Sequence, residues 1–232
     1  MHARFAWLLA AAGVTAHVAP AAAPVFPPIA RVLRVPLRIE SLRGVALTFD
    51  DGPHPEGTPA LLETLAEARA QATFFLVGEQ VERRPSLAAE IASAGHEVAL
   101  HCQRHRSLLL LTPRQLRDDL DRAATVIAGA TGRAPLLHRP PFGIFSASAL
   151  SIVRRRGWQP LLWSRWGRDW SAAATPSSIV EKVTRDLAPG DVLLLHDSDS
   201  YSSPGSWRQT VAAVPRILER VAQRGLTVEK VV

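Results

Sequence analysis

The sequence predicts a parallel α/β fold, in which apolar strands alternate with amphipathic helices. Short uncharged runs recur along the chain, and helix-capping residues with leucines at helical spacing follow them. These runs are continuously apolar rather than alternating, as expected for strands that helices cover on both faces of a sheet. A chain of 232 residues is long enough for one sizeable core. The pattern fits an open doubly wound sheet and a closed barrel equally well.

Each predicted strand is an apolar run that stops at a polar residue or at a turn signal. The first begins at Val45 and ends on the adjacent carboxylates Asp50 and Asp51, directly before the turn signal Gly52-Pro53. Six further runs have the same character, which gives about seven strand–helix units. They cover 72–77, 97–101, 135–139, 159–164, 191–196 and 226–232.

The predicted helices are marked at their starts by caps and prolines and at several of their ends by glycines. Thr112 and Thr175 each stand before a proline, so the threonine caps the helix and the proline takes its first position. Thr58 is interpreted as the cap of the first helix. The helical segments cover 58–70, 78–94 with Pro85 opening a new helix, 112–130, 146–156, 175–187 and 206–224.

Residues 1–30 differ in composition from the rest of the chain. A basic start, an uncharged middle over 5–16 and a small-residue end with Ala19-Pro20-Ala21 are the three parts of an export signal. We therefore expect a signal peptide or an N-terminal membrane anchor, membrane contact through this segment, and a secreted or membrane-anchored protein. The alternative is an apolar helix packed on the domain, which leaves the protein cytoplasmic. Residues 31–43 form a basic lead-in, and residues 44–232 form a single domain.

The net charge of +6 comes almost wholly from arginine, since Lys182 and Lys230 are the only lysines. No basic run carries interleaved aromatic residues and no recognition-helix pattern occurs, so nucleic acid is not an expected partner. The glycine-rich nucleotide-binding motifs follow none of the predicted strands. Cys102 is the single cysteine, which excludes an intrachain disulfide.

Polar side chains gather at the carboxyl ends of the predicted strands, where both parallel architectures place their chemistry. Random placement would scatter such residues along the chain. We therefore expect one functional site at this rim of the sheet. Its candidate residues are Asp50, Asp51, His101, Arg139 and His196, with Asp169 a few residues beyond the fifth strand.

His101 and His105 are four residues apart, so both imidazoles face one side if the chain turns helically there. Two imidazoles and one carboxylate form a common site for a divalent metal with an open position for water or substrate. Cys102, between the histidines, is an alternative soft ligand. One of Asp50 and Asp51 is expected to join the histidines, and the other to take a proton from metal-bound water.

The remaining rim residues suit supporting roles in a hydrolysis. Arg139 would hold the carboxylate base through a charge-assisted hydrogen bond. His196 would protonate the leaving group, and Asp169 would orient His196 and raise its pKa. The alternative for His196 is a core histidine bonded to a backbone carbonyl.

Five motifs in order resemble those of the polysaccharide deacetylase family, the NodB-homology or carbohydrate esterase 4 group, over residues 44–197. Thr48-Phe-Asp-Asp-Gly-Pro53 is similar to the first motif, which implies Asp50 as the catalytic base and Asp51 as a metal ligand. His101-Cys-Gln-Arg-His105 is similar to the second motif, which implies both histidines as the other ligands.

Arg139-Pro-Pro-Phe-Gly143 is similar to the third motif. The resemblance implies that Arg139 positions Asp50 and that the backbone N–H of Phe142 helps bind the oxyanion. Two positions depart from the family pattern. Cys102 stands where the second motif has Ser or Thr, and Trp166 stands where the fourth motif begins with Asp.

Asp169-Trp170 is similar to the end of the fourth motif and Leu194-Leu-His196 to the fifth. The resemblance implies that Asp169 tunes the acid and that Trp170 forms a wall of the groove. It also implies that His196 is the acid and that Leu194 lines a pocket for the acetyl methyl group.

The fold that the resemblance implies is a distorted parallel (β/α) barrel of about seven strands. The implied cofactor is a divalent metal, usually zinc, with cobalt or another divalent ion as the alternative. The implied reaction removes an N- or O-acetyl group from an acetylated glycan or glycoconjugate, with N-acetyl favoured. Two further hypotheses stay open, a hydrolase of a small non-sugar amide or imide and a glycan-binding module without catalysis.

Overall fold

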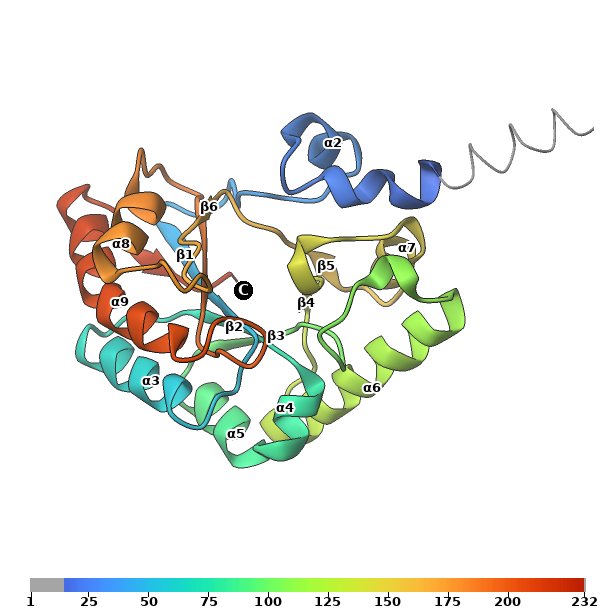
Figure 1. The fold of residues 1–232 in the computed structure, drawn as a ribbon, viewed down its shortest axis with the longest axis horizontal. Coiled ribbons are helices and arrows are strands. Elements are labelled where there is room, and N and C mark those ends of the chain that lie inside the picture. Colours follow the sequence, from blue (N-terminus) through green and yellow to red (C-terminus); the bar gives the residue numbers. More distant parts are fainter. Residues whose placement is uncertain (1–14, 232) are drawn as a thin grey trace, which may run out of the picture.

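The sheet at the centre of the structure, a computed structural model, is parallel and strongly curled (Figure 1). The structure describes residues 15–231. Seven strands follow the order β5-β4-β3-β2-β1-β7-β6, and β8 pairs with the amino end of β1. The strands are β1 (Val45–Asp50), β2 (Thr73–Leu76), β3 (Glu97–Leu100), β4 (Leu137–His138), β5 (Gln159–Pro160), β6 (Arg165–Trp166), β7 (Val192–His196) and β8 (Val228–Glu229).

The helices lie around the outside of this curled sheet, as Figure 1 shows. Two of them, α8 and α9, pack on each other, as do α5 and α6. The bounds are η1 (Ala19–Ala22), α2 (Pro27–Val32), α3 (Gly57–Glu67), α4 (Gly78–Arg83), α5 (Pro85–Ser93), η2 (Leu108–Leu110), α6 (Pro113–Thr131), η3 (Pro141–Gly143), α7 (Ala147–Arg155), α8 (Pro176–Thr184) and α9 (Ser206–Gln223). The predicted single-domain (β/α) barrel of about seven strands is confirmed as a half-barrel.

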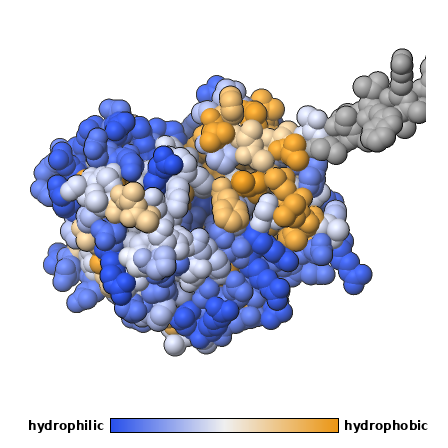
Figure 2. Space-filling view, in the orientation of Figure 1, coloured by the Kyte–Doolittle hydropathy of each residue, from blue (hydrophilic) through white to orange (hydrophobic). Residues whose placement is uncertain are grey.

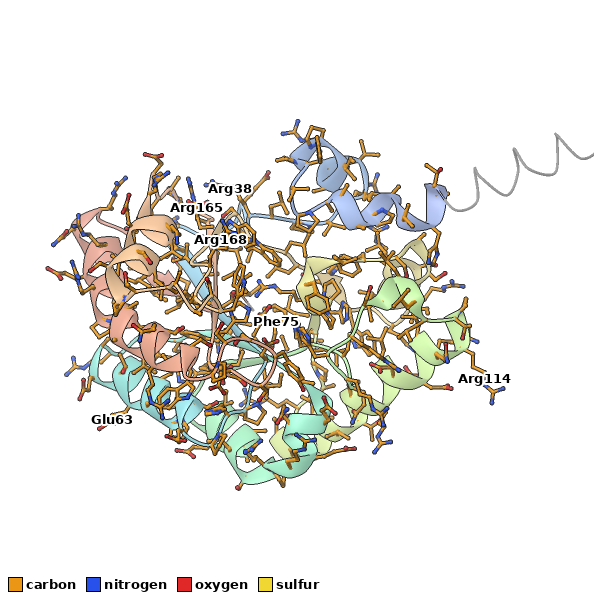
Figure 3. All side chains as sticks on the ribbon, viewed as in Figure 1. Arg38, Glu63, Phe75, Arg114, Arg165 and Arg168 are labelled. Carbon is orange, nitrogen blue, oxygen red and sulfur yellow. The ribbon has the colours of Figure 1, made fainter. Side chains whose placement is uncertain are left out.

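Strand β1 lies at the centre of the core because all six of its residues are buried. It pairs in parallel with β2 on one side and with β7 on the other. Phe49 of β1 stacks on Phe74 of β2 with ring centroids 5.1 Å apart. Figure 3 shows Phe75 inside the barrel, whereas Glu63 and Arg114 project outward from α3 and α6. A continuously buried strand therefore delivers its last residues to the rim in a fixed position.

Two of the predicted caps are confirmed, and the prediction for Thr58 is wrong. Thr112 and Thr175 both form capping boxes at the starts of α6 and α8. Helix α3 begins one residue before Thr58, and Glu56 occupies the N-cap position. The Thr58 hydroxyl is buried and donates to the carboxylate of Asp197 instead. The Thr58 side chain therefore forms a tertiary hydrogen bond and not the helix cap that the local pattern predicted.

Replacing Thr112 by Ala should lower the free energy of unfolding by about 1 kcal/mol, because the amide N–H of Gln115 loses its acceptor. Thr125→Ala in the same helix is the matched control, since its hydroxyl donates only to a mid-helix carbonyl. Urea unfolding followed by circular dichroism measures both variants. Equal losses in the two variants would contradict a specific role for the cap.

The strand predicted over 159–164 is wrong beyond its first two residues. Strand β5 ends at Pro160, and residues 161–164 cross from one edge of the sheet to the other. The N–H of Leu161 donates to the carbonyl of His138 next to β5, whereas the N–H of Ser164 donates to Val192 of β7. These different partners show that the segment leaves one edge of the sheet and reaches the other. It therefore links the edge strands β5 and β6.

The described part of the N-terminal segment is folded onto the domain. Helix α2 and η1 lie beside α7 at one side of the barrel mouth (Figure 1). Ala23 and Ala30 are buried in the hydrophobic core. Within residues 15–231, no helix combines the length and the apolar character needed to cross a membrane. The predicted signal peptide or anchor covers residues 1–30, of which residues 1–14 lie outside the described residues, and it stays a prediction.

Candidate active site

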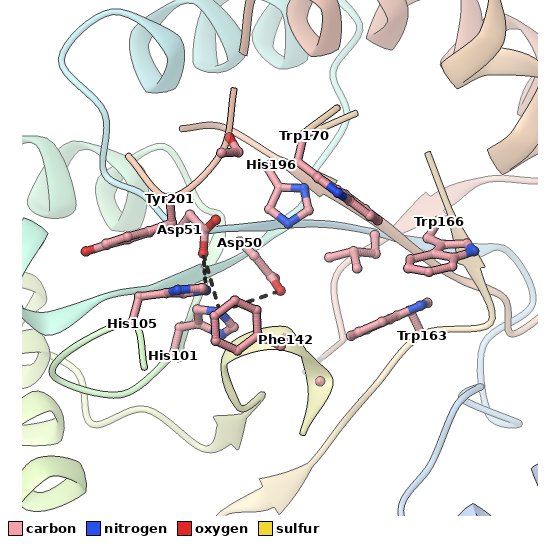
Figure 4. A pocket seen from close by; sticks show the side chains of 13 residues that line it. Asp50, Asp51, His101, His105, Phe142, Trp163, Trp166, Trp170, His196 and Tyr201 are labelled. Atoms are coloured by element: carbon pink, nitrogen blue, oxygen red, sulfur yellow. Dashed lines mark ion pairs between the residues drawn. The ribbon is translucent and has the colours of Figure 1, made fainter. Parts of the chain in front are cut away.

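The adjacent carboxylates at the end of β1 face different partners. Asp50 ends the strand, and Asp51 takes a left-handed backbone conformation with φ of +81°. This conformation is rare for a residue other than glycine, and such residues cluster at functional sites. Figure 4 shows Asp51 beside two histidines and Asp50 lying away from it in the same pocket. The turn at Asp51 therefore separates two chemically identical groups.

Asp51, His101 and His105 form a cluster that could hold a metal ion. The Nε2 atoms of His101 and His105 lie 3.4 and 3.3 Å from the same oxygen, Oδ1 of Asp51. One candidate ligand atom from each residue lies within 4.8 Å of the others. The Oδ1 atom of Asp51 is buried and has no hydrogen bond of normal geometry in the described structure. A buried oxygen facing two imidazoles in this way is the arrangement expected around a divalent cation.

The pKa values in this cluster favour the protonation states of metal ligands. Burial alone would raise the pKa of Asp51. The neighbouring imidazoles, His101 first, lower it by more, so the net pKa is about 2. Burial lowers the pKa of His105 to about 4, although the charge of Asp51 opposes that shift. Near neutral pH, Asp51 is therefore an anion and His105 is a neutral imidazole with a free lone pair.

Asp50 forms a buried ion pair with Arg139 at 2.7 Å. The same Nη1 donates to the hydroxyl of Thr48, and the other guanidinium nitrogens donate to the carbonyls of Leu161 and Leu162. Burial lowers the pKa of Arg139 below its ordinary value, and the Asp50 carboxylate offsets only part of this shift. Because every nitrogen of Arg139 has a partner, the guanidinium holds the Asp50 carboxylate at a fixed place and angle.

His196 ends β7 beside Asp50 and pairs with a buried carboxylate behind it. Its residue position is in register with Asp50 across the β1–β7 ladder. The Nδ1 atom lies 3.0 Å from Oδ1 of Asp169, and the backbone N–H of His196 donates to Oδ2 of Asp169. Burial lowers the pKa of His196, but the charge and hydrogen bond of Asp169 raise it to a net value of about 10. His196 is thus a protonated acid at neutral pH.

Replacing Asp169 by Asn should move the alkaline limb of the pH–rate profile to lower pH. His196 can donate a proton only below its pKa, and the variant loses the charge that raises this pKa. The pH dependence of kcat measures the shift. Thr210→Val is the matched control, because Thr210 donates a 2.7 Å hydrogen bond to Asp169 but carries no charge. A profile for Asp169→Asn that superimposes on the wild-type profile would remove Asp169 from this role.

These groups surround a pocket of about 260 Å³ with largely aromatic walls (Figure 4). The ring of Trp166 lies 6.1 Å from Trp163 and 5.2 Å from Trp170 between centroids. On the opposite side, Tyr201 stacks on His105 at 4.4 Å with the planes 12° apart. The other lining residues include Phe142, Leu194 and His196.

Sequence reasoning missed Tyr201 and Trp163 as pocket residues. Tyr201 is the only tyrosine in the chain and follows β7 on the rim, which is the signal that could have identified it. Its hydroxyl donates a 2.6 Å hydrogen bond to Glu79, and this bond holds the ring against His105. Trp163 lies in the crossing segment that was predicted to be a strand, so its direction could not be inferred from strand alternation.

Cys102 does not belong to the metal-ligand cluster among the described residues. Its backbone is left-handed, with φ of +70°, and its Sγ atom lies 3.4 Å from Nε2 of the buried His138. Burial lowers the pKa of His138 to about 3, so its imidazole is neutral. The thiol thus contacts His138 in the core and does not join the two histidines of its own loop.

The structure brings all of the predicted site residues together at the rim. Arg139 and Asp169 lie behind the pocket and contact Asp50 and His196. The other predicted residues line the pocket directly, namely Asp50, Asp51, His101, His105, Phe142, Trp170, Leu194 and His196.

Comparison with known proteins agrees with this geometry. The family model described as "Polysaccharide deacetylase" matches residues 40–161. A peptidoglycan-N-acetylglucosamine deacetylase of Bacillus cereus is 35% identical to this chain. The match covers 78% of this chain and 83% of that relative. A chitooligosaccharide deacetylase of Sinorhizobium fredii is 37% identical to this chain. The match covers 79% of this chain and 88% of that relative.

Among solved structures, the Bc1960 peptidoglycan N-acetylglucosamine deacetylase superposes with a TM-score of 0.78 at 28% identity. The superposition covers 84% of this chain and 88% of that one. Sequence, fold and rim residues therefore agree, and the resemblance inferred from the five motifs is confirmed. The chain belongs to the polysaccharide deacetylase family of hydrolases.

Proposed function

We propose that the protein is a metal-dependent deacetylase that removes acetyl groups, N-acetyl in preference, from a polysaccharide or glycoconjugate. The observation that carries this proposal is that the two adjacent carboxylates have different partners. Asp51 faces two histidines, whereas Asp50 is held by Arg139 within the same pocket. The names of the relatives, peptidoglycan-N-acetylglucosamine and chitooligosaccharide deacetylases, support an N-acetylated sugar as the substrate class.

Asp51, His101 and His105 would hold the metal. Two imidazole nitrogens and one carboxylate oxygen suit zinc in a catalytic site with an open position, and cobalt or another divalent ion can use the same donors. When bound, a divalent cation supplies a Lewis acid that lowers the pKa of a water molecule and offsets negative charge on a carbonyl oxygen.

The chain's own groups divide the remaining steps of hydrolysis. Asp50, positioned by Arg139, accepts the proton of the attacking water as the water oxygen bonds to the acetyl carbon. The backbone N–H of Phe142 donates to the oxyanion that develops on the carbonyl oxygen. His196 donates its proton to the sugar nitrogen as the carbon–nitrogen bond breaks, which releases acetate and a free amine.

The pocket walls fit a sugar that carries a small acyl group. Leu194 lies in the pocket wall beside His196 and would contact the acetyl methyl group. Trp170 meets His196 edge-on with centroids 5.5 Å apart, and with Trp166 it offers apolar faces to the C–H groups of a pyranose ring. Trp166, which replaces the acidic residue of the family motif, makes this wall more apolar.

We also propose that residues 1–30 direct the protein out of the cytoplasm, either as a cleaved signal or as a membrane anchor. The basic start and the uncharged run that follows support this placement. Fractionation of cells that express the full chain, with N-terminal sequencing of the mature protein, tests it. Recovery of the intact chain from the cytosol would contradict it.

Acetate release by the purified protein tests the proposed reaction. The substrates are N-acetylglucosamine oligomers, peptidoglycan, acetylated xylan and a small chromogenic acetate ester, each with and without chelator. Acetate that disappears with chelator and returns with zinc or cobalt is the expected result. Hydrolysis of free amides alone would favour a small-amide hydrolase, and glycan binding without acetate would favour a binding module.

A further inference from the structure

An apolar face borders one side of the pocket mouth. Figure 2 shows hydrophobic residues gathered over the N-terminal segment and the loops beside it, whereas the rest of this view is mostly hydrophilic. A patch of this kind on a monomer marks a surface that meets a protein or a membrane. The exposed side chains of this apolar face are Val18, Val25, Phe26, Val32, Leu110 and Phe142.

Contacts between its segments hold the apolar face together. The Nε2 atom of His17 lies 3.4 Å from the carbonyl oxygen of Leu109, which joins residues 15–18 to η2. A side-chain carbon added at Gly143 would lie 3.2 Å from the ring of Pro24, so η3 and the N-terminal segment are in close contact. Phe142 belongs both to the face and to the pocket wall. The face is therefore continuous with the active site.

The charge pattern of the contributing segments is one-sided. Residues 1–39 contain no Asp or Glu, and neither do residues 98–117 or 122–168, which include η2 and η3. The same segments carry exposed arginines, among them Arg31, Arg34 and Arg104. An apolar surface built from segments that carry arginine and no acidic residue suits the headgroup region of an anionic bilayer.

Two observations favour a bilayer over a second copy of the chain. A two-fold contact through this face would bring together two surfaces whose segments carry arginine and no acidic residue, and such surfaces repel. The described chain also begins at this face, and the fourteen residues that precede it in sequence carry no charged side chain after Arg4. A bilayer can accommodate the apolar face and these residues at once.

We infer that the apolar face docks the enzyme on an anionic lipid bilayer, with the pocket mouth at the membrane surface. The inference about substrate rests on the proposed function: the acetylated sugar is then one carried on a lipid or presented close to the bilayer. Docking limits the search for such a substrate to two dimensions and presents its sugar to the mouth beside Phe142.

Vesicle co-sedimentation of the full chain tests docking without any substrate. The probes are vesicles of phosphatidylcholine mixed with phosphatidylglycerol, and vesicles of phosphatidylcholine alone. We expect the wild-type protein to bind the anionic vesicles more strongly than the neutral ones. The double variant Phe26→Asp/Leu110→Asp should lower the partition coefficient roughly tenfold or more, because two apolar contacts are replaced by anions.

Leu136→Asp is the matched control, because Leu136 is an exposed leucine that precedes β4 and lies at the opposite end of that strand from the rim. It should bind vesicles as the wild type does. A second variant, Arg31→Gln/Arg34→Gln, should weaken binding to anionic vesicles and leave binding to neutral vesicles unchanged. Circular dichroism and thermal unfolding confirm that each variant is folded.

Wild-type protein that stays in solution with both vesicle types overturns the inference, and so does a double variant that binds like the wild type. A separate kinetic arm compares a soluble chitooligosaccharide with an N-acetylglucosamine glycolipid in anionic vesicles. The double variant should lose roughly tenfold in rate on the glycolipid only. Vesicle binding with no acetate from either substrate would contradict the proposed function and leave docking standing.

Discussion

Asp50→Asn should lower kcat by about 10²- to 10⁴-fold and leave metal binding unchanged. The amide has nearly the same shape as the carboxylate and still accepts a hydrogen bond from Arg139, but it cannot take up a proton from the attacking water. Metal content should be retained because Asp51 lies 3.4 and 3.3 Å from the two histidines, whereas Asp50 lies 4.0 Å from His101 alone and is not part of the candidate ligand set. Steady-state acetate release and atomic emission on the same sample measure both quantities.

The variant also leaves a buried guanidinium without its anion, so its stability will fall as well. Asp191→Asn is the control for the loss of a buried carboxylate from an ion pair, and its partner Arg38 is partly exposed. Asp191 is fully buried and pairs with Arg38 at 2.7 Å, but it precedes β7 at the end of the strand away from the rim. It should lose stability without losing kcat. Full turnover by metal-loaded Asp50→Asn would remove Asp50 from the role of base.

Removal of the metal should lower kcat/KM by about a thousandfold or more, since the Lewis acid is worth several kcal/mol in the transition state. Dialysis against a chelator should abolish acetate release, and one equivalent of zinc or cobalt should restore it. His105→Ala should bind metal far more weakly, because one of the three donors is lost.

Thermal unfolding provides a readout of the same site that does not depend on activity. Added zinc should raise the Tm of the apo wild-type protein, since a ligand that binds only the folded state stabilises it. The rise should disappear in His105→Ala and persist in His96→Ala, whose histidine is buried but lies outside the cluster. A wild-type Tm that does not respond to any divalent cation would show that the cluster is not a metal site.

The residues at the rim of the site were predictable because they depend on local sequence patterns and on sheet topology. Continuous apolar runs indicate buried parallel strands, and parallel strands place their last residues at one edge of a sheet. Asp50 and His196 end two such strands and His101 follows a third, so their proximity could be inferred without any knowledge of side-chain directions. Capping by Thr112 and Thr175 was predictable for the same reason, since every partner lies within four residues.

Features that depend on distant partners were not predictable. The left-handed conformations of Asp51, Cys102 and Phe142 oppose local preference, and the surrounding fold must hold them. Residues 159–164 have the composition of a strand, but a short apolar run is equally suited to a buried crossing. Thr58 has the signature of a cap, and the approach of Asp197, the first residue after β7, gives it another partner.

The crossing segment also affects how the protein avoids aggregation. A parallel sheet with two free edges offers unpaired backbone groups to the strands of other molecules. Here the edge strands β5 and β6 are two residues each, and residues 161–164 join them. Because each edge is so short, an incoming chain would find little backbone to pair with. The protein should therefore resist edge-to-edge assembly as long as this segment keeps the two short edges joined.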